Sequence, residues 1–121
     1  MEQQEKQQIQ AVVHKMLGAM VLKKGSDLFL TAGFPPAIKL NGKLTKLNET
    51  LLTADQTSKM ARAIASEKQW QAYIDTKGQN FAISLEGIGR FRINIFTQQQ
   101  RTGMVIRVIT TDDGLTLDPA T

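Results

Sequence analysis

Apolar residues recur at helical spacing near the start of the chain. One stripe of an amphipathic helix is formed by Ile9, Val12, Val13, Met16, Leu17, Met20 and Val21. Lys23 and Lys24 supply a cationic last turn, and Gly25 follows as the expected C-terminal glycine. His14 lies off this stripe. We therefore expect the single histidine to face solvent rather than to act as a ligand or a base.

The next segment alternates between polar and apolar residues, as strands do. The run SDLFLTAG is β-prone and ends at a glycine, and PPAIKLNGKLTKL places Asn41-Gly42 between two alternating segments. An Asn-Gly pair in that position is the strongest hairpin signal in the chain. Pro35 and Pro36 have no N–H group to donate to a neighbouring strand, so the hairpin should begin after them.

Two short helices are predicted in the middle of the chain. Thr53 followed by Gln56, and Ser66 followed by Gln69, each match a capping box. Gly78 then marks the end of the helical region. The buried sides of these helices should come from Met60, Ala61, Ile64, Trp70, Tyr73 and Ile74.

From residue 80 to residue 110 the apolar period changes to two. Alternate positions are filled by Phe81, Ile83, Leu85, Phe91, Ile93, Ile95, Met104, Ile106 and Val108. This predicts a three-stranded antiparallel meander that turns at EGIG and TQQQRTG and buries one face against the helices. We expect a single α+β domain over residues 1–110, an antiparallel sheet with helices packed on one face, and an exposed tail or truncated linker over residues 111–121.

The last hairpin should place two arginines side by side. With a four-residue loop at residues 98–101, apolar residues pair only with apolar ones: Phe91 with Val108, Ile93 with Ile106 and Ile95 with Met104. A slip by one residue would break every pair, so the register is well determined. The same register sets Arg92 opposite Arg107 on the other face, with Arg90 one pleat away.

Folding alone gives no reason for that arginine pair. Like charges facing one another on a sheet cost from a few tenths to about 1 kcal/mol. An anion between them would make the arrangement favourable, because each guanidinium can make charge-assisted and often bidentate bonds to phosphate or carboxylate. A glutamate elsewhere in the chain, or solvent, is the competing explanation. The spacing of the residues leaves both open.

Composition narrows the classes of function. With 15 basic and 11 acidic residues the formal net charge is +4, a modest excess that suits an anionic partner, and the absence of cysteine excludes disulfides and thiolate metal sites. The sequence contains no phosphate loop, no G-x-S-x-G elbow and no Cys/His metal spacing. It has no secretory signal and no apolar run of about 20 residues. We expect a cytoplasmic chain with no metal site, no catalytic residue and no enzymatic activity of its own.

Two stretches resemble the N-terminal domain of the PilT/PilU family of type IV pilus retraction ATPases. They are GSDLFLTAGFPPAIKLNGKL at residues 25–44 and NFAISLEGIGRFRINIFTQQQRTGMVIRVI at residues 80–109. The motifs G-S-D-L, G-x-P-P, N-G and G-R-F-R follow one another in that order, and G-S-D-L-F, N-F-A-I-S and G-M-V look closer to the PilU branch. The resemblance covers nearly the whole chain up to about Ile109.

The resemblance implies a PAS-like domain joined by a linker to a RecA-like ATPase domain. Such proteins form hexamers at the inner-membrane pilus machine, as homo-hexamers or with a partner retraction ATPase. The N-terminal domain would pack on the ATPase domain of the neighbouring subunit and offer arginines to its nucleotide phosphates. By motif these are Arg92 in GRFR, Arg107 in VIRV and Arg101 in QQQRTG. ATP and Mg²⁺ are then cofactors of the full-length assembly and not of the isolated domain, and neither nucleic acid nor membrane insertion is implied.

Two other functions are compatible with such a domain. A PAS-like sensory module would hold a small ligand in an apolar cavity, whereas the bulky inward residues of the meander favour a filled core. A nucleic-acid-binding sheet would need exposed aromatics beside the arginines, and Phe96 is the only aromatic on that face of its strand. We rank the nucleic-acid function lowest.

Overall fold

Helix α1 (Gln3–Leu22) opens the fold in the computed structural model, which describes residues 2–109. Val13, Leu17 and Met20 are fully buried, which confirms the predicted helix and its stripe. Val12 is wrongly placed by the pattern, because it lies at the edge of the stripe and is 50% exposed. His14 is half-buried rather than fully solvent-facing. The predicted tail at residues 111–121 lies outside the described residues.

The end of α1 differs in detail from the prediction. The left-handed residue is Lys24, with φ 62°, and the N–H of Gly25 donates to the carbonyl oxygen of Met20 at 2.8 Å. Gly25 is needed for close packing instead. A Cβ atom there would lie 3.0 Å from Cγ of Met20 and 3.3 Å from the carbonyl oxygen of Lys39. The helix thus ends where the sequence predicted, but Gly25 serves close packing and Lys24 takes the left-handed conformation.

Strands β1 (Asp27–Leu30), β2 (Ala37–Leu40) and β3 (Lys43–Lys46) follow, and the hairpin between β2 and β3 is confirmed. Asn41 and Gly42 have φ 51° and 79°, as a two-residue type I′ turn requires. The prolines lie before β2, where no N–H donor is required from them, and the carbonyl oxygen of Pro36 accepts from the N–H of Leu47 at 2.8 Å.

Helices α2 (Ala54–Ile64) and α3 (Glu67–Thr76) both begin with the predicted capping boxes. The N–H of Gln56 donates to Oγ1 of Thr53, and the N–H of Gln69 donates to Oγ of Ser66, each at 3.1 Å. Ile74 is 42% exposed, so the pattern was wrong to bury it. No helix within residues 2–109 is both long enough and apolar enough to cross a membrane.

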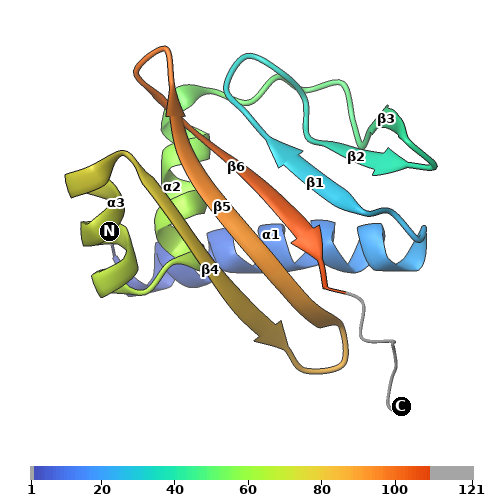
Figure 1. Cartoon of the computed structure of the whole chain (residues 1–121), viewed down its shortest axis with the longest axis horizontal. Helices are drawn as coiled ribbons and strands as arrows, with labels where there is room; N and C mark the ends of the chain where they lie inside the picture. Colours follow the sequence, from blue (N-terminus) through green and yellow to red (C-terminus); the bar gives the residue numbers. More distant parts are fainter. Residues whose placement is uncertain (1, 110–121) are drawn as a thin grey trace.

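Strands β4 (Gly78–Leu85), β5 (Gly89–Gln98) and β6 (Arg101–Val108) form the predicted meander. They join the first three strands through pairing of β1 with β6, which gives one antiparallel sheet in the order β3-β2-β1-β6-β5-β4. In the view of Figure 1, α1 and α2 pass behind this sheet and α3 lies beside β4, so that the front of the sheet is left without a covering helix. The expected α+β fold, with helices on one face of an antiparallel sheet, is confirmed.

The register of the last hairpin is also as predicted. Phe91 pairs with Val108, Ile93 with Ile106 and Ile95 with Met104. The side chains of β5 in these pairs point toward the helices and are fully buried. The residues between them consequently point to the front of the sheet.

The turn of this hairpin is shorter than predicted, because Gln98 and Arg101 still pair with one another. Only Gln99 and Gln100 remain in the turn, with φ 52° and 64°. Left-handed backbone is unfavourable for residues with a Cβ atom, and type I′ turns prefer Asn-Gly.

Replacing Gln99-Gln100 by Asn-Gly should therefore raise the free energy of unfolding by about 1 kcal/mol. Urea unfolding followed by circular dichroism measures the change. The matched control is Gln98→Asn, at a strand position, for which we expect no gain. Equal or lower stability of the Asn-Gly variant would show that the glutamine turn carries no backbone strain.

Candidate functional site

Arg92 and Arg107 lie directly opposite one another on the front of the sheet, as the pairing predicted. Arg92 is exposed, and 71% of the Arg107 side chain is accessible to solvent. The Cβ atoms of facing residues in an antiparallel pair are about 5 Å apart. Two guanidinium groups are thus anchored within reach of a single anion.

A buried carboxylate, which the sequence reasoning did not identify, holds one of these arginines. Asp27 of β1 pairs with Arg107 on the side away from Arg92, and only 7% of its side chain is exposed. Nε of Arg107 donates to Oδ2 of Asp27 at 3.2 Å. The competing explanation of an acidic partner is therefore correct for Arg107, with an aspartate in place of a glutamate. Nε of Arg107 is occupied, whereas its two terminal nitrogens have no hydrogen-bond partner among the described residues.

The pKa of Asp27 is lowered from its ordinary value of 3.8. Burial acts in the opposite direction and raises this pKa, but hydrogen bonds from Ser26 and Arg107 and the positive charges of Arg107 and Lys39 together outweigh it. The ionised carboxylate is therefore the form that the fold stabilises.

This lowered pKa makes stability depend on pH. The contribution of Asp27 should be complete above about pH 4 and should disappear as the pH falls through the lower pKa of the folded state. Unfolding measured from pH 7 to pH 2 should show that the stability difference between the native chain and Asp27→Asn shrinks at acid pH. Asp75→Asn is the control, because it removes the same charge from an exposed site in α3. A difference that is constant over this range would contradict the assignment.

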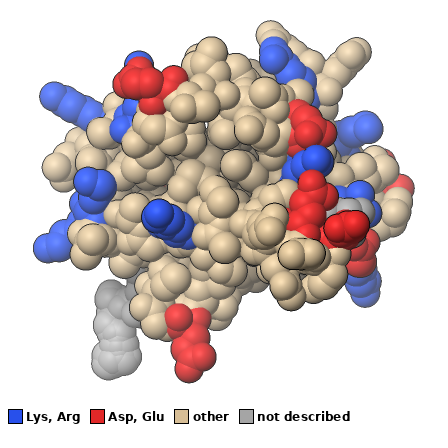
Figure 2. Space-filling model, turned by 180° about the vertical axis from the view of Figure 1, so that it is seen from behind, with Lys and Arg blue, Asp and Glu red and all other residues tan. Residues whose placement is uncertain are grey.

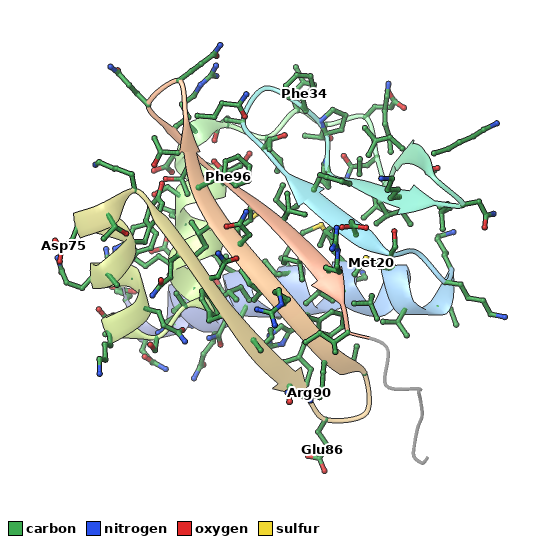
Figure 3. The ribbon with its side chains drawn as sticks, viewed as in Figure 1. Met20, Phe34, Asp75, Glu86, Arg90 and Phe96 are labelled. Carbon is green, nitrogen blue, oxygen red and sulfur yellow. The ribbon has the colours of Figure 1, made fainter. Side chains whose placement is uncertain are left out.

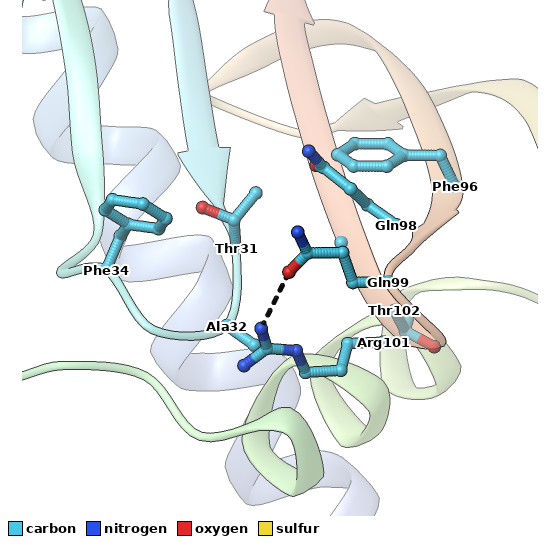
Figure 4. A pocket seen from close by; sticks show the side chains of 9 residues that line it. Thr31, Ala32, Phe34, Phe96, Gln98, Gln99, Arg101 and Thr102 are labelled. Atoms are coloured by element: carbon cyan, nitrogen blue, oxygen red, sulfur yellow. Dashed lines mark hydrogen bonds between the residues drawn. The ribbon is translucent and has the colours of Figure 1, made fainter.

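Arg101 lies apart from the other two arginines. It begins β6, whereas Arg107 is near the end of that strand, and six residues of strand span about 20 Å. Nη2 of Arg101 donates to Oε1 of Gln99 at 3.1 Å, as Figure 4 shows. The structure thus brings Arg92 and Arg107 together and does not bring Arg101 to that pair.

Two hollows lie near the Arg101 end of the sheet. The first, of about 230 Å³, is bordered by Phe34 on one side and by Phe96 and Gln98 on the other (Figure 4). The second, of about 340 Å³, is mostly apolar and is lined by Phe29, Thr31, Phe34, Pro35, Ala37, Leu44 and Lys46. Figure 3 shows Phe34 on the loop after β1, and Phe34 and Leu44 are 64% and 67% exposed. The front of the sheet therefore carries the arginine pair, Arg92 and Arg107, and an apolar patch that includes Phe34 and Leu44.

The helix side of the molecule has a different charge pattern. Figure 2 shows acidic and basic side chains next to one another at one edge of this side. Lys59 of α2, for instance, lies 3.2 Å from Oε2 of Glu5 and 3.4 Å from Oδ2 of Asp55. Within the described part of the chain, no group of three or more potential metal ligands occurs. The front of the sheet is the better candidate for an anionic partner.

A third hollow, of about 440 Å³, lies where α1 ends beside β6, and Lys24 and Arg107 contribute to its lining. All three hollows open to solvent. None of them is the enclosed ligand cavity that a sensory module would need.

Comparison with known proteins identifies relatives of this chain. No protein-family model matches the chain. Over 98 residues, 81% of this chain, it is 44% identical to the type IV pilus ATPase PilU of Pseudomonas aeruginosa, and over 97 residues it is 30% identical to the retraction ATPase PilT of the same organism. This chain is homologous to the N-terminal part of PilU and PilT. It spans only about a quarter of their length, 26% of PilU and 28% of PilT.

Solved structures agree with the PilT relationship. The crystal structure of the pilus retraction motor PilT with bound ADP superposes with a TM-score of 0.73 at 30% identity, over 78% of this chain and 28% of that one. The ATPase DotB of Legionella pneumophila gives a TM-score of 0.73 at 18% identity, over 91% of this chain and 32% of that one, which shows the shared fold alone. The predicted resemblance to the N-terminal domain of PilT and PilU is confirmed.

Proposed function

We propose that this chain is the N-terminal interaction domain of a hexameric pilus retraction ATPase. In this proposal the front of its sheet packs on the ATPase domain of the neighbouring subunit, in the cytoplasm at the inner-membrane pilus machine. Arg92 and Arg107 contact the phosphates of the nucleotide bound there, and Arg101 contacts the same neighbour at the other end of β6. ATP and Mg²⁺ belong to the assembly, and the domain alone does not hydrolyse ATP.

The observation that carries the proposal is the facing pair Arg92 and Arg107. The fold places these like charges opposite one another, with Asp27 bonded to Nε of Arg107, and leaves both arginine side chains accessible to a partner. A guanidinium aimed at a phosphate stabilises the negative charge that develops during phosphoryl transfer. ADP is bound in the solved structure of the relative PilT, so nucleotide is a ligand of that protein.

The apolar patch on the same side supports the packing part of the proposal. Protein interfaces bury an apolar centre and surround it with polar groups. The exposed side chains of Phe34 and Leu44 fit the centre of such an interface, and the pair Arg92 and Arg107 fits its polar rim. A sheet face without a helix over it is well suited to receive a neighbouring subunit.

A chimera tests the proposal. The 98 matching residues of Pseudomonas aeruginosa PilU are replaced by the residues of this chain that match them, and ATP turnover and assembly are measured. We expect a hexamer in which Arg92→Ala and Arg107→Ala each lower kcat by about 10-fold or more. Lys68→Ala, which removes one positive charge from an exposed position of α3, should leave kcat unchanged. Unchanged turnover in both arginine variants would refute the phosphate contact and leave only the packing role.

A further inference from the structure

Three charged residues of neighbouring strands form one row across the front of the sheet. Arg92 of β5 faces Arg107 of β6, and Arg107 faces Asp27 of β1. The arginines are largely accessible, whereas Asp27 is buried. Asp27 therefore lies under one edge of the row, where it can hold a neighbour and is not placed to meet a partner itself.

We propose that Asp27 is a positioning residue for Arg107, which fixes its guanidinium so that the terminal nitrogens face the anion shared with Arg92. This inference rests on the proposed phosphate contact and adds to it a residue that orders the contact in advance. The acceptor at Oδ2 takes the Nε–H of Arg107. The edge formed by the two terminal nitrogens is left free for a bidentate bond to phosphate.

The contact with Arg107 gives a reason for the buried carboxylate of Asp27. Taking a carboxylate out of water is unfavourable unless it is paired, and an apolar residue would fill the same place in β1. Arg92 repels Arg107 from one side, and Asp27 attracts it from the other. Nε of Arg107 is thereby held toward β1, while most of the side chain stays accessible to solvent.

Asp27→Asn and Asp27→Ala together separate positioning from simple electrostatics. Both variants remove the same negative charge, but only asparagine keeps an oxygen that can accept the Nε–H of Arg107. In the PilU chimera we expect Asp27→Ala to lower kcat by about twofold to 10-fold relative to Asp27→Asn, with a smaller change in KM, since an ordered side chain is lost. Thermal unfolding of both variants is the control for correct folding, and each should show a cooperative transition.

The outcomes distinguish this inference from the proposed function. If Arg107→Ala lowers kcat while Asp27→Ala and Asp27→Asn behave alike, Asp27 acts through its charge or not at all, and the positioning role is wrong. If Arg107→Ala leaves kcat unchanged, the phosphate contact is wrong, and the positioning inference falls with it.

A measurement on the chain itself is independent of turnover. The Nε–H of Arg107, followed by NMR, should exchange with water more slowly in the native chain and in Asp27→Asn than in Asp27→Ala. The Nε–H of Arg92 serves as the reference on the same face. Equal exchange at the two arginines in the native chain would contradict the ordering of Arg107 by Asp27.

Discussion

Replacing Phe91 by alanine should lower the free energy of unfolding by about 3–5 kcal/mol. Phe91 is fully buried and has the largest side chain among the fully buried residues described. It lies on the helix-facing side of the sheet and pairs with Ile83 of β4 on one side and Val108 of β6 on the other. Because a domain of this size is stable by only about 5–15 kcal/mol, the variant should be close to unfolding at 37 °C.

Urea unfolding of Phe91→Ala measures this loss. The matched control is Asn94→Ala, because Asn94 belongs to the same strand but is exposed. A surface change of that kind should alter stability by less than about 0.5 kcal/mol. A loss below about 1 kcal/mol for Phe91→Ala would mean that the helix-facing side of β5 is not part of the well-packed core.

Elements with local signals could be predicted from the sequence. The capping boxes at Thr53 and Ser66 and the Asn41-Gly42 turn act within a few residues, so that the sequence specifies them directly. The pairing of Arg92 with Arg107 was predictable for a related reason. In one hairpin, apolar residues meet apolar residues in a single register, and this register determines the opposite face as well.

Features that depend on contacts between distant segments could not be predicted. Asp27 meets Arg107 only because β1 pairs with β6, and alternation along each strand does not specify which strands are neighbours. Arg101 is separated from the arginine pair because it lies six positions before Arg107 along β6, and the shorter turn makes Arg101 the first residue of that strand. At the end of α1, Lys24 is the left-handed residue, and Gly25 lies close to Met20 and to the carbonyl oxygen of Lys39, which is a contact between distant segments.

The largest functional effect should come from mixing two inactive forms of the PilU chimera. One form carries Arg92→Ala and Arg107→Ala with an intact ATPase domain, and the other has intact arginines and an inactivated ATPase domain. Each form alone should have little turnover. A head-to-tail ring of mixed subunits places some intact arginines against intact ATPase domains of neighbours.

Turnover of this mixture is the most direct test that the arginines act on a neighbouring subunit. In an equal mixture about one interface in four is complete on both sides, so we expect recovery to about a quarter of the turnover of the unmodified chimera. The control is the same mixture in which both forms lack the arginines, which should stay inactive. Turnover in the equal mixture no greater than the mean of the two separate forms would contradict a contact between subunits.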